Sequence, residues 1–205
     1  MATSASSTSI TSSPGTSEAV CPSGPRPRWT RSRTTGEPAS ALLRRLGERE
    51  LADVFYQYGE ERYSRRIARR IVEVRQREPI ETTTQLAELV RRCVPRPPSK
   101  RRSSIDPATR VFQALRIAVN DELAALEGLL AALPLCLKRG GRAVLISFHS
   151  LEDRRVKQAF RDRATWEVLT RKPIQASEEE EKANPRSRSA KLRAARRLDE
   201  TTHDK

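Results

Sequence analysis

The segment from Gly140 to Phe160, GGRAVLISFHSLEDRRVKQAF, decides the fold class. A glycine turn leads into an apolar run at 143–148, which a polar cluster follows at once. Continuous apolarity, rather than alternation, predicts a strand covered on both faces, as in a parallel α/β sheet. Ligands bind at the carboxyl ends of such strands. We therefore place a candidate active-site edge at Phe148, His149 and Ser150.

A long helix is predicted just before this strand. Asp106 followed by Pro107 is typical of a helix start, since Asp is a good N-cap and proline suits the first helical position. Apolar residues at helical spacing extend the helix over 107–133, and Asn120 and Glu122 on its polar face are candidates to reach the site edge. Pro134 and the glycine turn separate the helix from the strand.

Further elements follow the strand. Ser150 with Asp153 is predicted to cap a helix over 151–163. Short candidate strands follow at 167–174 and 190–198.

An all-helical unit is predicted upstream, from 35 to 105. Helices are expected at 39–46, 48–56 and 60–78, and Thr82 with Gln85 forms a capping box that opens the next one. The apolar face of that last helix contains Leu86, Leu89, Val90 and Cys93. A basic, proline-stiffened connector at 96–102 ends the unit.

The charge of the chain favours a polyanionic partner. Its 205 residues include 40 basic and 26 acidic ones, a net charge of +14. Phosphate neutralisation makes nucleic acid a better fit than an acidic protein or a membrane surface. The predicted phosphate contacts are Arg65, Arg69 and Arg70 on the 60–78 helix, with Arg101 and Arg186. A merely solvated arginine face is the alternative.

Other classes of protein fit the sequence poorly. Residues 1–34 are rich in Ser, Thr and Pro and are predicted to be disordered. No apolar run approaches the ~20 residues of a membrane span, and three scattered cysteines predict neither a metal site nor disulfides. The cytoplasm is the expected location, with an organelle as the alternative because the N-terminus faintly resembles a transit peptide.

A hydrolase built around Ser150 is disfavoured. His149, Ser150 and Asp153 are neighbours in the sequence, whereas a catalytic triad converges from separate elements.

Six blocks of this sequence, in order, resemble the MraW-type, S-adenosylmethionine-dependent N4-cytosine methyltransferases of 16S rRNA. The resemblance runs from Thr35 to Arg197. The blocks are residues 58–62 (YGEER), 66–69 (RIAR), 107–117 (PATRVFQALRI), 119–123 (VNDEL), 146–154 (ISFHSLEDR) and 184–189 (NPRSRS).

The resemblance implies an α/β fold, a partial class I (Rossmann-like) methyltransferase domain. It identifies 35–105 as the family's helical insert on the RNA side, and 106–205 as the carboxyl-terminal part of the methyltransferase domain. In that fold the last strand lies between the two before it. The family's glycine-rich cofactor loop, acidic ribose-binding residue and Ser-Pro motif are missing here, so we expect no cofactor-binding residue, and a truncated chain inactive alone.

The implied activity is methyl transfer from S-adenosylmethionine to a cytidine N4 of small-subunit rRNA, with Phe148, His149 and Ser150 as the pocket wall. The alternative is a non-catalytic, basic RNA-binding module.

Overall fold

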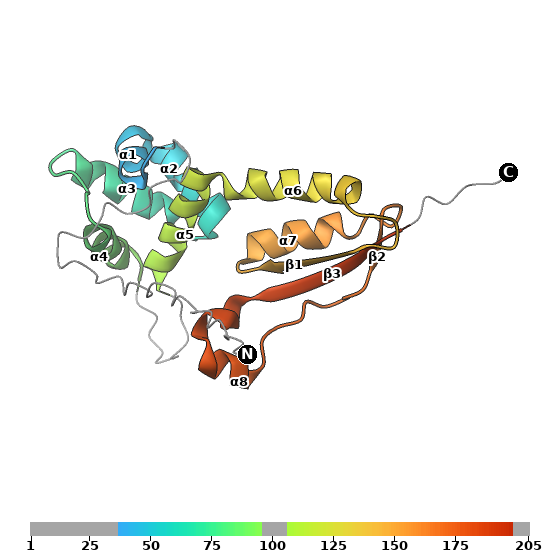
Figure 1. Cartoon of the computed structure of the whole chain (residues 1–205). Coiled ribbons are helices and arrows are strands. Elements are labelled where there is room, and N and C mark those ends of the chain that lie inside the picture. The colour runs from blue at the N-terminus through green and yellow to red at the C-terminus, as the bar shows by residue number, and fades with distance from the viewer. Residues whose placement is uncertain (1–36, 96–105, 199–205) are drawn as a thin grey trace, which may run out of the picture.

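A computed structural model describes residues 37–95 and 106–198 (Figure 1). Our predictions for residues 1–34, for the connector at 96–102 and for Arg101 lie outside these ranges. In the described part, a group of helices occupies one end, and a three-stranded sheet with two covering helices occupies the other.

The helical group begins with α1 (Ala39–Arg45), α2 (Glu48–Gly59), α3 (Ser64–Arg75) and α4 (Thr83–Cys93). The capping box of α4 is confirmed: the Thr82 side chain accepts from the Gln85 N–H at 3.2 Å, and Gln85 accepts from the Thr82 N–H at 2.9 Å. Its predicted apolar face is buried in the largest core cluster.

The third helix starts later than the sequence predicted. Glu60 adopts a left-handed φ of 50° and ends α2, so residues 60–63 form a turn rather than helix. The Glu61 carboxylate accepts the backbone N–H of Tyr63 at 3.0 Å and holds that turn.

The predicted long helix over 107–133 is wrong, because two helices occupy this region. Asp106 caps α5 (Pro107–Asn120) as predicted, accepting from the Ala108 N–H at 2.9 Å. Asp121 then takes a left-handed φ of 50°, which Asp tolerates better than most residues, and the chain turns into α6 (Glu122–Cys136). The break lets α5 join the helical core while α6 packs beside the sheet. Pro134 lies inside α6, whose last turn continues past it.

The sheet contains β1 (Arg142–Ser147), β2 (Trp166–Val168) and β3 (Lys191–Arg197) in the order β1-β3-β2, with β3 antiparallel to both neighbours. The last strand therefore lies between the other two, as the resemblance implied.

Strand β2 is shorter than the predicted 167–174. Leu169 and Thr170 both donate to the Ala194 carbonyl, which interrupts the ladder. Pro173 has no N–H to restore it, and only an isolated bridge from Ile174 to Leu192 follows. The acidic run forms α8 (Glu178–Ala183), followed by the 3-10 helix η1 (Pro185–Ser189).

Described residues cover only one face of β1, so our prediction of two covered faces is wrong for this part of the chain. Helix α7 (Ser150–Ala159) and α6 both lie on one side of the sheet (Figure 1). Ala143 and Ser147 are buried on that side, whereas Val144 and Ile146 are 56% and 57% exposed on the other. The described residues therefore leave the apolar side chains of Val144 and Ile146 uncovered.

Gly59 is required by close packing between α2 and α5. A Cβ there would lie 2.6 Å from the Arg110 carbonyl oxygen, whereas one on Gly128 of α6 would meet nothing within 4 Å. We expect Gly59→Ala to lower the free energy of unfolding by about 1–3 kcal/mol, as overpacking does. Gly128→Ala should be neutral or stabilising by up to about 1 kcal/mol. Denaturant unfolding of both variants tests this, and equal effects would refute the close approach.

Candidate active site at the carboxyl end of strand β1

His149, rather than Ser150, caps helix α7. The His149 Nδ1 accepts the Glu152 N–H at 3.3 Å, and the Glu152 carboxylate accepts the N–H groups of Phe148 and His149 at 2.8 and 3.3 Å. Our prediction of a Ser150 and Asp153 cap is therefore wrong. Ser150 is already the first helical residue, so its side chain is directed elsewhere.

The buried His149 ring lies beside two carboxylates. Its Nε2 is 3.2 Å from Glu152 Oε1 without the geometry of a hydrogen bond, and the possible ligand atoms of Glu122, His149 and Glu152 lie within 4.8 Å of one another. Burial raises the pKa of Glu152, but the neighbouring His149 ring and the hydrogen bond from the Phe148 N–H outweigh this and hold that pKa below its ordinary value.

His149 and Glu152 are better explained as a helix cap, and Glu122 as the partner of Arg116, than as a metal centre. Since Nδ1 accepts a backbone N–H, the proton of a neutral His149 ring stays on Nε2, which then has no lone pair for a cation. Glu122 is already bonded by Arg116 at 2.8 Å and by Asn120 at 3.2 Å. Glu122 therefore lies near His149, and a role for it at the site edge stays a prediction.

Ser150 joins the sheet end to the helical group. Its hydroxyl donates to Glu60 Oε2 at 2.8 Å, and Arg154 Nη2 donates to Glu60 Oε1 at 2.9 Å. The Ser150 hydrogen bond, with the Arg154 charge, holds the pKa of Glu60 below its ordinary value. A hydroxyl donating to a carboxylate is not arranged for attack in a Ser-His-Asp order, which weakens the hydrolase alternative further.

A pocket of about 490 Å³ opens where β1 ends. It is lined by Phe148, His149 and residues of α4, α5 and η1: Thr83, Thr109, Phe112, Gln113, Leu115, Arg116 and Ser189. The structure therefore brings two of the three predicted wall residues, Phe148 and His149, to one cavity, while Ser150 bonds Glu60 instead.

The sequence analysis singled out neither Arg116, which lines the pocket, nor Glu60, the partner of Ser150 outside the lining. Both belong to blocks that carry the family resemblance, which is the signal that marks them. Arg116 lines the pocket and is held by a bidentate bond to Glu122.

The predicted phosphate contacts are scattered. On α3, Arg69 pairs with Glu48 and Arg70 with Glu73, while Arg65 is exposed. Arg186 lies exposed in η1. Three arginines that follow it bond to internal partners: Arg193 to Asp153, Arg196 to Glu167 and Arg197 to the Leu137 carbonyl.

No described residues form a glycine-rich cofactor loop. Such a loop links the end of a strand to a helix, yet β1 passes into α7 through Phe148 and His149, and Gly140 and Gly141 precede β1. S-adenosylmethionine thus has no loop to hold it in the described part of the chain. None of its helices is both long and apolar enough to cross a membrane.

The β1-β3-β2 order fits a partial α/β domain of the methyltransferase type. A match to the MraW methylase family covers residues 30–198. The chain belongs to this family.

The curated relatives of this chain are named as ribosomal RNA methyltransferases. The ribosomal RNA small subunit methyltransferase H of Crocosphaera subtropica is 59% identical over 159 residues, which cover 78% of this chain and 49% of that protein. The protein of the same name from Rhodopirellula baltica is 54% identical, over 80% of this chain and 50% of its own length. The protein of the same name from Acidobacterium capsulatum is 55% identical, over 78% of this chain and 53% of its own length. The chain spans about half the length of the curated relatives it matches.

Proposed function

We propose that this chain supplies the target-base side of an S-adenosylmethionine-dependent enzyme that methylates the N4 amine of a cytidine in small-subunit rRNA. The observation that carries the proposal is the convergence of family blocks around one pocket. Phe148 and His149 come from the strand-end block, Arg116 from α5 and Ser189 from the end of the NPRSRS block.

The pocket suits a base turned out of its stack. Phe148 is 55% exposed at the cavity wall, so its ring is free to stack on a flipped base. The lone pair of the N4 amine is delocalised into the ring, so the site must orient it, and positioning supplies much of the acceleration. The Arg116–Glu122 pair and the His149 cap hold these wall residues in position.

The cofactor side must come from outside the described residues. We propose that the 205-residue chain alone does not methylate RNA, and that an amino-terminal half like that of its relatives completes the enzyme in the cytoplasm. Arg65, Arg69, Arg70, Arg101 and Arg186 are the proposed phosphate contacts.

Replacing Phe148 in a completed enzyme tests the pocket. The chain is joined to the amino-terminal half of the Rhodopirellula baltica relative and assayed on small subunits verified as unmethylated. We expect Phe148→Ala to lower methyl transfer about 10- to 100-fold, because base stacking on an aromatic ring contributes roughly 1–3 kcal/mol.

The matched control is Tyr56→Ala, an exposed aromatic residue on α2 outside this pocket, which should leave the rate unchanged. No methylation by the unsubstituted joined protein would contradict the proposed function. Equal rates for Phe148→Ala and the unsubstituted protein would remove Phe148 from the site.

A non-catalytic RNA-binding module is the second candidate, favoured by the lack of a cofactor loop in the described residues. Its binding would weaken log-linearly with salt whatever the RNA sequence. A preference for unmethylated small-subunit rRNA that persists at high salt would reject it.

A further inference from the structure

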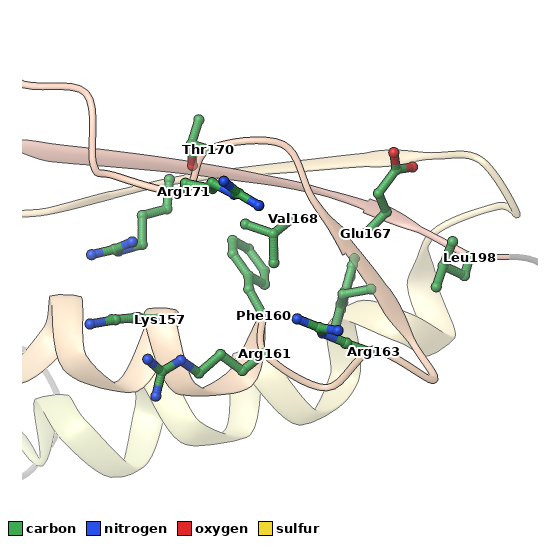
Figure 2. A pocket seen from close by; sticks show the side chains of 11 residues that line it. Lys157, Phe160, Arg161, Arg163, Glu167, Val168, Thr170, Arg171 and Leu198 are labelled. Atoms are coloured by element: carbon green, nitrogen blue, oxygen red, sulfur yellow. The ribbon is translucent and has the colours of Figure 1, made fainter.

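A second pocket, also of about 490 Å³, lies at the opposite end of helix α7 from the candidate active site (Figure 2). The ten residues of α7 separate the two by about 15 Å, at 1.5 Å per residue. The second pocket lies between the end of α7, strand β2 and the loop after β2. Its lining includes Lys157, Phe160, Arg161, Arg163, Val168 and Arg171.

The rim of this pocket carries uncompensated positive charge. Lys157, Arg161, Arg163 and Arg171 are exposed, and none forms an ion pair with a described residue. The one acid in the lining, Glu167, points away from the other labelled side chains in Figure 2 and is bonded to Arg196. The fifth lining cation, Arg193, is bonded to Asp153.

Neighbouring acids offset the charge of the rim only in part, and Asp162 forms no ion pair with a described residue. Asp162, between two rim arginines, accepts from the Ala164 N–H and the Thr165 hydroxyl at 3.1 and 2.6 Å. Asp153 is bonded to Arg193, although Lys157 lies close enough to help lower its pKa.

The floor of the pocket is apolar. Phe160 and Trp166 are buried with ring centroids 5.3 Å apart, and Val168 is partly exposed above them. A cation at the end of α7 is also favoured by the helix dipole. The dipole explains Lys157 in the last turn of α7, but it does not explain Arg161 and Arg163, which follow the helix, or Arg171, which follows β2.

We propose that this pocket, here called the α7-end pocket, binds backbone phosphates of the RNA substrate, with the adjoining sugar and base against Val168 and Leu198. The four cations are spread around an open rim on three segments, which fits successive phosphates of a strand better than one compact anion. This inference rests on the proposed function, which identifies the RNA as the substrate. Its test measures RNA binding and does not depend on methylation.

The test compares two triple variants of the 205-residue chain. The pocket variant is Arg161→Gln, Arg163→Gln and Arg171→Gln. The matched control is Arg44→Gln, Arg49→Gln and Arg77→Gln, three exposed arginines of the helical group that form no ion pair with described residues. Both lose the same charge. The probe is a fluorescent, mixed-sequence single-stranded RNA of about 20 nucleotides, titrated by anisotropy from 0.05 to 0.5 M salt, and circular dichroism verifies that the folds match.

Each phosphate contact contributes about 0.7 to the salt slope for a single strand, so the pocket variant should lose about 2 in slope. If the affinities of the unsubstituted chain and the pocket variant become equal near 1 M salt, the pocket variant should bind the RNA roughly 100-fold more weakly than the unsubstituted chain at 0.1 M salt. The control should lose much less.

Equal losses in the two variants would overturn the proposal, since only overall charge would then matter. A free nucleotide is the other source of phosphate, and ATP is the probe for it. Loss of ATP binding by the pocket variant, with RNA affinity unchanged, would also overturn the proposal. Because neither readout involves methyl transfer, a failed methylation assay leaves this result interpretable.

Discussion

Joining the chain to the amino-terminal half of a curated relative will stabilise it and create saturable S-adenosylmethionine binding, whereas the 205-residue chain alone will bind none. The reason lies in the bare side of the sheet. Val144 and Ile146 are more than half exposed there, and pairing places Ala194 and Leu192 beside them.

The bare surface extends across the sheet and along its edge. Ile174, 57% exposed, bridges to Leu192, and Leu169 is exposed beside Ala194. Among the described strands, β1 pairs only with β3, so its other edge is free. A free apolar edge is an aggregation site unless something covers it.

Helix α6 also exposes apolar surface. It is apolar on all sides, yet only Leu123 is buried, and Leu129 and Leu135 are exposed. A helix that is apolar all round belongs in a protein interior.

Val144, Ile146, Leu169 and Ile174 are each about half exposed. Covering each of them should contribute about half the free energy of a full side-chain burial, so the four together should raise the free energy of unfolding by on the order of 4 kcal/mol. Scanning calorimetry and S-adenosylmethionine titration of the chain and the joined protein measure both effects. A sharp two-state melt of the 205-residue chain, or cofactor binding by it, would show that the bare face needs no partner.

Asp153→Asn will lower the free energy of unfolding by about 3–5 kcal/mol, the cost of breaking a buried ion pair from one side. Arg193 Nε donates to Asp153 Oδ1 at 2.6 Å, and Nη2 to Oδ2 at 3.1 Å, with 7% and 13% of the two side chains exposed. This pair fastens α7 to the central strand β3. Removing the carboxylate leaves the Arg193 charge buried without a partner.

The control for Asp153→Asn is Glu127→Gln, which breaks the solvent-exposed pair between Glu127 and Arg155. That pair should contribute at most about 1 kcal/mol. Urea unfolding of the joined protein measures both variants. Equal losses would mean that the Asp153–Arg193 pair stabilises no more than a surface contact.

The same pair predicts a dependence on pH. The Arg193 hydrogen bond and charge lower the pKa of Asp153 in the folded chain. A carboxylate whose pKa is lower in the folded state than in the unfolded state stabilises the fold. This contribution is fully present above the unfolded pKa of about 3.9, and it is lost as the pH falls through the folded pKa. The difference in stability between the unsubstituted protein and Asp153→Asn should therefore shrink below about pH 4. A difference that stays constant from pH 7 to pH 3 would contradict this linkage.

The sequence by itself determined those elements whose signals are local. Thr82 with Gln85 and Asp106 with Pro107 start helices where predicted, because a cap depends on atoms within three residues. The apolar run before Phe148 likewise marked a strand and a site edge, and the family blocks determined the strand order.

Tertiary structure decided what depends on distant partners. Asp121 breaks a continuous helical pattern because α5 packs on the helical group while α6 packs beside the sheet. Neighbouring residues after β1 separate in the same way: His149 caps α7, Ser150 bonds Glu60 ninety residues away, and Asp153 bonds Arg193. Composition shows that a chain is basic, but it does not show which arginines form ion pairs with carboxylates. Long side chains on different segments meet only after folding, so the uncompensated rim of the α7-end pocket is visible in the structure alone.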